Sequence, residues 1–321
     1  MKYYLGVDLG GTNIAAGVVD ENFQIIAKDS MPTKAGRSME SIIGDVVKTA
    51  EMAAADAGIS LRQFTSLGIG MPSCVNPKTH LLVHANNLDW KNVPIYDCFK
   101  AHIKLPLFIE NDANCAVLGE TLAGNAKSCE NVVMLTLGTG VGGGIILNKR
   151  IYAGADMLGA ELGHVKLVYN GIRCSCGQKG CLESYCSATA LIEQTKESMK
   201  TERTSLLWDM CHGSFQGLDG RLIFEAAANG DATAKNAVAQ YTDYLAAGIS
   251  TFITIFRPEV IILGGGIAEA GSTLLDTLNR KVRAVTFAAD EIGVPPVVKA
   301  ALGNDAGIIG AALLERYTEK R

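Results

Sequence analysis

Three cysteines fall within eight positions of the sequence, and a histidine precedes them by ten residues. The segment is HVKLVYNGIRCSCGQKGCLESY, residues 164–185, and its candidate ligands are His164, Cys174, Cys176 and Cys181. Thiolate sulfur and imidazole nitrogen bind Zn²⁺, but the same thiols could also form a disulfide or a redox pair. The odd total of nine cysteines and the lack of a recognisable export signal both weaken the disulfide interpretation.

A polar pair follows an apolar strand in PLFIENDANCAVLGE, residues 106–120. Asn111 and Asp112 come directly after that strand, where polar side chains are expected to point into a cleft. A carboxylate in that position could accept the proton of an alcohol that attacks a phosphoryl group. The alternative is that the pair only caps the following helix, or that Asp112 and Asn114 divide the two roles.

Three glycine-rich turns, each after an apolar strand, indicate polyphosphate binding. They are DLGGT (8–12), GTGVGGG (138–144) and LGGGI (263–267). Backbone N–H groups can approach phosphate only where no Cβ intrudes. For any one turn, a tight hairpin that simply requires glycine is the alternative. Asp8, just before the first turn, could serve Mg²⁺ directly or through water, or could cap the turn.

Two nucleotide-binding patterns are excluded. The spacing of Gly138, Gly140 and Gly143 matches G-x-G-x-x-G, but apolar strand residues continue after it, where the dinucleotide fingerprint requires a helix. The sequence contains no G-x-x-x-x-G-K-[ST], so a P-loop is excluded as well.

The elements that must position these residues repeat within the chain. Residues 3–27 and 131–154 follow the same order of apolar strand, glycine turn, strand, polar turn and strand, which indicates an internal duplication. The other predicted elements are a helix at 37–57, a strand at 66–75, a mostly helical region at 187–250 and a helix at 304–320. The small residues of the last helix predict close packing, back onto the first domain.

The length of 321 residues suits about two domains, and 48% hydrophobic residues allow a large core. A net charge of −4 and a pI of about 5.8 argue against a nucleic-acid partner, which needs a basic face. The sequence has no run of 18 apolar residues, so we expect no membrane association and a cytoplasmic protein.

In this order, DLGGT, GTGVGGG and LGGGI resemble the nucleotide motifs of the hexokinase, actin and Hsp70 ATPase superfamily. GAELGH (159–164) and CSCGQKGCLESY (174–185) resemble one branch of it, the ROK family of bacterial sugar kinases and repressors, over residues 3 to about 315. The resemblance implies an α/β, two-lobed actin-like ATPase (ribonuclease H-like) fold with a duplicated βββαβα-type core and a cleft. We expect a small lobe at 1–111, joined by the helix at 305–321, and a large lobe at 112–304 that carries a zinc loop at 164–183.

The resemblance also implies roles for individual residues. Asp112 would be the catalytic base. The sugar contacts would be Asn86, Asn111, Asp112, Glu161, His164 and Glu183. The ATP and Mg²⁺ contacts would be Asp8, Gly10, Gly11, Thr12, Asn13, Thr139, Gly140, Gly265 and Gly266. A structural zinc would be held by His164, Cys174, Cys176 and Cys181, with Cys186 as an alternative ligand.

These expectations favour an ATP-dependent kinase that phosphorylates the 6-hydroxyl of a hexose, with glucose as the preferred substrate. Kinases of allose, mannose or N-acetylmannosamine are the near alternatives. A ROK transcriptional regulator is an alternative of another class, but such proteins carry a DNA-binding domain before the first glycine turn, and here the first strand starts at Tyr3. An actin- or Hsp70-like ATPase is disfavoured by the cysteine cluster. The family is expected to form dimers or tetramers.

Overall fold

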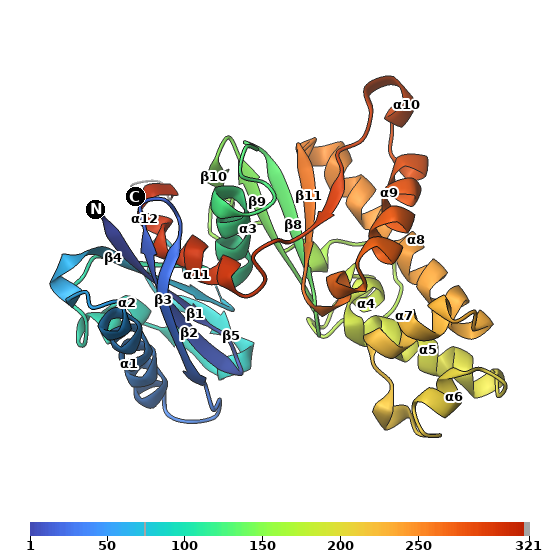
Figure 1. The fold of residues 1–321 in the computed structure, drawn as a ribbon, viewed down its shortest axis with the longest axis horizontal. Helices are drawn as coiled ribbons and strands as arrows, with labels where there is room; N and C mark the ends of the chain where they lie inside the picture. Colours follow the sequence, from blue (N-terminus) through green and yellow to red (C-terminus); the bar gives the residue numbers. More distant parts are fainter. Residues whose placement is uncertain (74, 318–321) are drawn as a thin grey trace. The chain divides into compact units, whose positions relative to one another are not determined.

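A β-hairpin opens a five-stranded sheet at the start of the chain. In the computed structural model, β1 (Tyr3–Leu9) pairs antiparallel with β2 (Asn13–Asp20), and β2 pairs antiparallel with β3 (Ile25–Pro32). β4 (Phe64–Met71) runs parallel to β1, and β7 (Leu107–Asn111) runs parallel to β4. The strand order is therefore β3-β2-β1-β4-β7, and Figure 1 labels all of these strands except β7.

A second five-stranded sheet repeats this order. Its strands are β8 (Val132–Leu137), β9 (Val141–Leu147), β10 (Arg150–Ile151), β11 (Val260–Gly264) and β12 (Val297–Lys299). They stand in the order β10-β9-β8-β11-β12. In both sheets the first strand along the chain lies in the middle, the second and third lie to one side, and the fourth and fifth lie to the other. The duplication predicted from residues 3–27 and 131–154 is confirmed.

The two faces of the first sheet bury side chains of different size. Side chains alternate between faces along a strand, so Leu5 and Val7 share one face of β1 while Gly6 and Asp8 share the other. The large side chains belong to one apolar core together with α1 (Met39–Asp56). The bulky face therefore packs on α1, which leaves the glycine face for other helices.

The glycine face allows the backbone of α11 (Asp305–Ala312) to approach closely. A Cβ on Gly68 would lie 1.7 Å from the carbonyl oxygen of Ala311, and one on Gly6 would lie 2.2 Å from that of Ile308. Neither distance is accessible to a real side chain, so both strands need glycine at these points. The small residues of α11 accordingly pack closely, as predicted, and its partner is the sheet that begins the chain.

α3 (Asp112–Ala123) follows β7 directly. The remaining helices and strands are β5 (Leu82–Ala85), β6 (Trp90–Val93), α2 (Ile95–Lys100), α4 (Glu183–Cys186), α5 (Ala188–Thr201), α6 (Leu207–Met210), α7 (Gly220–Ala228), α8 (Ala232–Phe256), α9 (Ser272–Val285), α10 (Ala289–Ile292) and α12 (Leu314–Tyr317). The region 187–250 is mostly helical, as expected. The β5–β6 hairpin and α2 were not predicted.

The chain divides into two compact units. The first comprises residues 1–132, 144–160 and 301–321, and the second comprises 133–143 and 161–300. The first unit thus contains α3, which the predicted boundary between residues 111 and 112 assigns to the other lobe. α3 belongs with the first sheet because its Gly119 lies against Ala306 of α11, where a Cβ would come within 2.1 Å of the Ala306 carbonyl oxygen.

The structure describes residues 1–73 and 75–317, except for the side chain of Asn86. The last residues of the predicted C-terminal helix, 318–321, lie outside the described residues. Among the described helices, none combines the length and the apolar character needed to cross a membrane.

Replacing Gly68 by alanine tests the close approach of α11. The added methyl group would overlap the Ala311 carbonyl, so α11 must move, and we expect the free energy of unfolding to fall by about 3 kcal/mol or more. Gly44→Ala in α1 is the control, because nothing lies within 4 Å of the added Cβ. The free energy of unfolding of that variant should rise by about 0.5–1 kcal/mol. Equal melting curves for the two variants would show that α11 is not held as described.

Candidate functional site

The predicted site residues form two groups, one in each unit. Asp8, the first glycine turn, Asn111 and Asp112 belong to the first unit. The second glycine turn as far as Gly143, the third glycine turn and the cysteine cluster belong to the second unit.

Asp8 and the start of α3 lie on the glycine face of the first sheet. The strand register aligns Asp8 of β1 with Gly70 of β4, and Gly70 with Glu110 of β7. An ideal Cβ on Gly70 would lie 3.7 Å from the Cα of Asp112 and 3.1 Å from the sulfur of Cys115. Because Gly70 carries no side chain, the first turn of α3 can lie over β4, which brings Asp112 to the side of the sheet that bears Asp8.

The carboxyl groups of Asp8 and Asp112 are electrostatically coupled. Burial raises the pKa of Asp8 to about 7, and the negative charge of Asp112 adds to the shift. Burial also raises the pKa of Asp112, although hydrogen bonds from the backbone oppose this effect. A raised pKa makes a carboxylate a stronger base, and a pair of carboxylates in this setting attracts a cation.

Asn111 and Asp112 have different local duties. Asn111 is the N-cap of α3, and its Oδ1 accepts hydrogen bonds from the backbone N–H groups of Ala113 (2.9 Å) and Asn114 (3.2 Å). The Asn111 side-chain amide therefore keeps its NH₂ group for another partner. Asp112 Oδ1 accepts from the backbone N–H of Ala113 at 2.8 Å. Capping thus falls mainly on Asn111, which weakens the interpretation of Asp112 as a cap alone.

Glu110 supports this junction, and the sequence analysis missed it. The side chain is 5% exposed, and its Oε1 accepts hydrogen bonds from the Asn111 backbone N–H (2.9 Å) and from Asn114 Nδ2 (3.1 Å). The sequence feature that could have identified Glu110 is a carboxylate within an otherwise apolar strand, because a buried ionisable side chain needs hydrogen-bond partners.

The first glycine turn joins β1 to β2 and is closed by a hydrogen bond from Gly10 N–H to the Asn13 carbonyl at 2.9 Å. Thr12 and Asn13 are exposed, and Gly10 and Gly11 are half-buried. A Cβ on Gly11 would lie 2.9 Å from the Cβ of Asn87, so this turn touches the loop after β5. That loop also contains Asn86, whose predicted sugar contact lies outside the described side chains.

The second turn lies against a flexible side chain, and the third requires glycine because of its backbone. Between β8 and β9, a Cβ on Gly140 would lie within 2.4 Å of Glu183 Oε2. After β11, Gly265 has a φ of +83°, and its Cβ would lie 2.4 Å from the Leu137 carbonyl oxygen. The third turn is therefore packed directly on β8. Gly266 begins a 3₁₀ turn that leads towards α9.

The four predicted metal ligands converge. The ligand atoms of His164, Cys174, Cys176 and Cys181 all lie within 4.8 Å of one another. Cys176 Sγ and Cys181 Sγ are 3.7 Å apart, and Cys174 Sγ lies 3.8 Å from His164 Nδ1. A tetrahedron with zinc–sulfur bonds of about 2.3 Å has sulfur–sulfur edges of about 3.8 Å, so the donor set fits zinc.

The surroundings favour anionic sulfur at Cys176 and Cys181 but not at Cys174, where burial raises the thiol pKa and Sγ donates to Glu183 Oε1 at 3.4 Å. The Lys166 ammonium donates to Cys181 Sγ at 3.2 Å. A backbone hydrogen bond at Gln178 is the main cause of a lowered pKa for Cys176. All eight cysteines that the structure describes are free thiols, and Cys186, the alternative ligand, is not in the cluster. The disulfide interpretation is therefore not supported for the described cysteines.

Two glutamates adjoin the cluster. Glu161 is the N-cap of the 3₁₀ turn Leu162–His164, and its carbonyl accepts a hydrogen bond from the His164 backbone N–H at 3.0 Å. The Glu183 carboxylate accepts hydrogen bonds from the Ser175 hydroxyl at 2.9 Å and the Val141 N–H at 3.0 Å. Glu183 thereby joins the cysteine loop to the second glycine turn, a role that the sequence analysis did not anticipate.

Comparisons with known proteins agree with this arrangement. The family model described as "ROK family" matches residues 4–317. A glucokinase of Thermotoga maritima is 37% identical over 96% of this chain and 95% of its own length. A glucokinase of Streptomyces coelicolor is 35% identical over 98% of each chain.

A solved structure gives the fold. The crystal structure of a ROK family glucokinase from Streptomyces griseus in complex with glucose and AMPPNP matches with a TM-score of 0.80 and 34% identity, over 97% of this chain and 98% of that one. The architecture is the two-lobed actin-like ATPase fold of the ROK sugar kinases. This fold and the full-length family match both lead to one conclusion: the chain belongs to the ROK family.

Proposed function

We propose that this protein is an ATP-dependent hexose kinase that transfers the γ-phosphoryl group of ATP to the 6-hydroxyl of glucose. The observation that carries the proposal is Asp112, a carboxylate with a raised pKa at the first position of α3, directly after Asn111 and coupled to Asp8. Full-length similarity to glucokinases supports the choice of glucose over other hexoses.

Asp112 acts as the general base. A sugar hydroxyl is a weak nucleophile at neutral pH, and its proton must leave while the bond to phosphorus forms. Asp112 Oδ1 is engaged by a backbone N–H, and the other carboxylate oxygen takes the proton. Asn111 donates its NH₂ group to a sugar hydroxyl, since its oxygen is occupied by the helix cap.

The three glycine turns bind the nucleotide, through Gly10–Asn13, Thr139 with Gly140, and Gly265 with Gly266. Backbone N–H groups in such turns bind phosphate oxygens. Asp8 holds Mg²⁺, directly or through water, because a buried carboxyl of raised pKa regains its charge beside a cation. The Mg²⁺ ion supplies positive charge that neutralises the phosphates.

The cysteine cluster holds a structural Zn²⁺ and orients the sugar-binding side chains. His164 faces the cluster through Nδ1, so Nε2 remains for a sugar hydroxyl. Glu161 and Glu183 adjoin the same loop and complete the sugar contacts. Four protein ligands leave the ion no open position, so its contribution is to fix the loop.

Asp112→Asn separates catalysis from capping. The variant keeps the size and the acceptor oxygen of the side chain but cannot accept a proton. We therefore expect kcat for glucose to fall by at least about 10²-fold, with glucose affinity by calorimetry within tenfold of wild type. If Asp112 were only a cap, stability would instead fall by about 1 kcal/mol while kcat hardly changed.

The wild-type assay that accompanies this variant uses glucose, mannose, allose and N-acetylmannosamine with ATP. Glucose should give the highest kcat/KM. A different preferred hexose would correct the substrate, and no ATP-dependent product with any hexose would contradict the kinase proposal and favour a regulator.

Elemental analysis tests the metal. We expect one zinc per chain, and Cys176→Ser should lose zinc together with much of the glucose affinity, because His164 is then no longer held. Cys98→Ser is the matched control, since Cys98 is a half-buried thiol outside the cluster. A zinc-free wild-type protein with full activity would contradict this role.

Asp8→Asn tests how much the ionisation of Asp8 lowers the stability of the folded, nucleotide-free protein. The folded state keeps the Asp8 proton up to a pKa of about 7, while the unfolded chain releases it near 3.8. Between these values the folded state binds more protons, so the Asp8 contribution to stability falls as pH rises. The free energy of unfolding of the variant, relative to that of the wild type, should therefore rise between pH 4 and pH 7, by at most about 1.4 kcal/mol per pH unit. Urea unfolding at both pH values measures this, and a constant difference would contradict it.

A further inference from the structure

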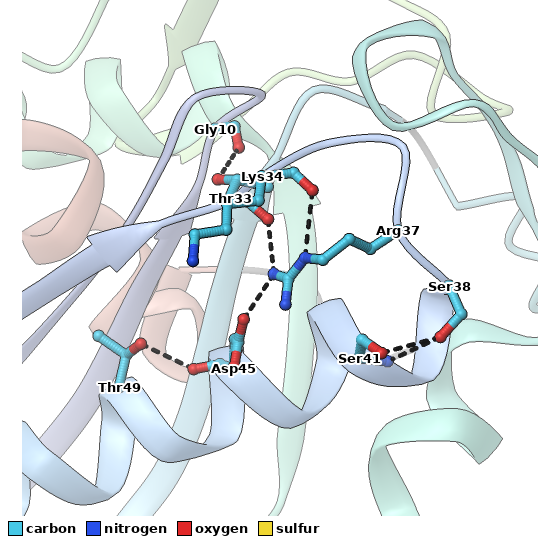
Figure 2. Close-up of polar contacts among 8 residues, drawn as sticks. All are labelled: Gly10, Thr33, Lys34, Arg37, Ser38, Ser41, Asp45 and Thr49. Atoms are coloured by element: carbon cyan, nitrogen blue, oxygen red, sulfur yellow. Dashed lines mark hydrogen bonds and ion pairs between the residues drawn. The ribbon is translucent and has the colours of Figure 1, made fainter.

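Thr33, the residue after β3, forms hydrogen bonds with two residues of the first glycine turn, Gly10 and Thr12. Its hydroxyl donates to the Gly10 carbonyl at 2.7 Å (Figure 2), and its backbone N–H donates to the Thr12 carbonyl at 2.9 Å. The residue is completely buried. A fully buried hydroxyl with a single well-aligned acceptor fixes the position of that acceptor, so the Gly10 carbonyl is tied to the end of β3.

Arg37 holds Thr33 in turn. Its Nη2 donates to the Thr33 carbonyl at 2.7 Å, and its Nε donates to the Lys34 carbonyl at 3.2 Å (Figure 2). Lys34 has a φ of +48°, in the left-handed region that residues with a side chain seldom adopt. The guanidinium thus binds the two carbonyls at an unfavourable corner of the backbone and stabilises it.

The other anchor of Arg37 is α1. Arg37 Nη2 contacts Asp45 Oδ2 at 2.5 Å, and the two side chains are 34% and 25% exposed. Ser38 caps α1 immediately after Arg37 by accepting from the Ser41 N–H at 3.3 Å. An ion pair exposed to this extent contributes little energy by itself, but the planar fork of arginine gives it a defined geometry.

These contacts form a continuous path from Asp45 through Arg37 and Thr33 to Gly10. We propose that Arg37 and Thr33 are positioning residues that hold the first glycine turn in the conformation that binds ATP phosphate. This inference rests on the proposed kinase function. Neither residue needs to touch the nucleotide, because phosphate binding by backbone N–H groups depends on how those groups are oriented, and the path fixes the backbone that carries them.

Thr33→Val removes the hydroxyl and keeps the shape of the side chain. We expect KM for ATP to rise about fivefold, the effect of one lost hydrogen bond, while KM for glucose stays within twofold. Thr49→Val is the matched control. Thr49 is also completely buried, and its hydroxyl donates to the Asp45 carbonyl at 2.7 Å within α1. If both valine variants had the same KM for ATP, the proposal would be overturned.

Arg37→Lys tests the second step of the path. Lysine keeps the positive charge but cannot bind two carbonyls and a carboxylate in one plane, so KM for ATP should again rise. Arg283→Lys is the control, because Arg283 forms an exposed ion pair with Asp290 at 2.9 Å, in the second unit. A rise for Arg283→Lys equal to that for Arg37→Lys, or no rise for Arg37→Lys, would contradict the role of Arg37.

Amide hydrogen exchange tests the path without relying on activity. Gly10 N–H is protected by its bond to Asn13, and it should exchange at least several times faster in Thr33→Val but not in Thr49→Val. Unchanged exchange would overturn the positioning role. The exchange could be faster in Thr33→Val although the wild-type protein phosphorylates no hexose. That result would show that Thr33 holds the glycine turn, and that the proposed kinase function, together with the role in phosphate binding, is wrong.

Discussion

The approach of the α11 backbone to the first sheet determines the surroundings of the partly buried Asp8 and of α3, the helix that begins with Asp112. The helix fits because β1, β4 and α3 present glycine where it crosses them, and because α11 contributes its own small residues. A Cβ on Gly310 of α11 would come within 1.8 Å of the Cys115 carbonyl oxygen, and one on Gly307 would come within 2.8 Å of Asp8 Oδ2. The helix therefore covers Asp8 on one side and α3 on the other, and this packing contributes to the desolvation that raises the pKa of Asp8.

The fully or partly buried carboxylates of the first unit fall into two groups. Glu120 is completely buried, and its two oxygens accept hydrogen bonds from the backbone N–H groups of Leu302 (2.7 Å) and Asn125 (3.1 Å). Glu110 is likewise satisfied by neighbouring N–H groups. Such carboxylates support structure, because their partners replace water. Asp8 and Asp112 have raised pKa values, which suits groups that exchange protons or bind cations.

Sequence reasoning predicted the features that depend on local pattern. The repeated order of apolar strands and glycine turns predicted the duplication that the two sheets show. The spacing of three cysteines after His164 predicted a metal-ligand cluster, and the four ligand atoms converge in the structure. The role of Glu183 was incompletely predicted, because its contact with Val141 joins segments 42 residues apart. The β5–β6 hairpin was missed because its strands have four residues each, too few for a period to be recognised. Thr33 was missed because nothing in its sequence neighbourhood indicates contact with Gly10.

The lysine beside the cysteine cluster has a consequence for which ion the loop can accept. Three thiolates carry three negative charges, and a neutral imidazole adds none. A divalent ion leaves one negative charge, which the Lys166 ammonium, 3.2 Å from Cys181, cancels. The ion, the three thiolates and the Lys166 ammonium would then sum to zero charge beside the buried Cys174 and Cys181, and the Glu183 carboxylate adds a negative charge next to the cluster. A monovalent copper ion would leave the same loop with an uncompensated charge in a partly desolvated place. With a divalent ion bound, Lys166 would offset one of the thiolate charges.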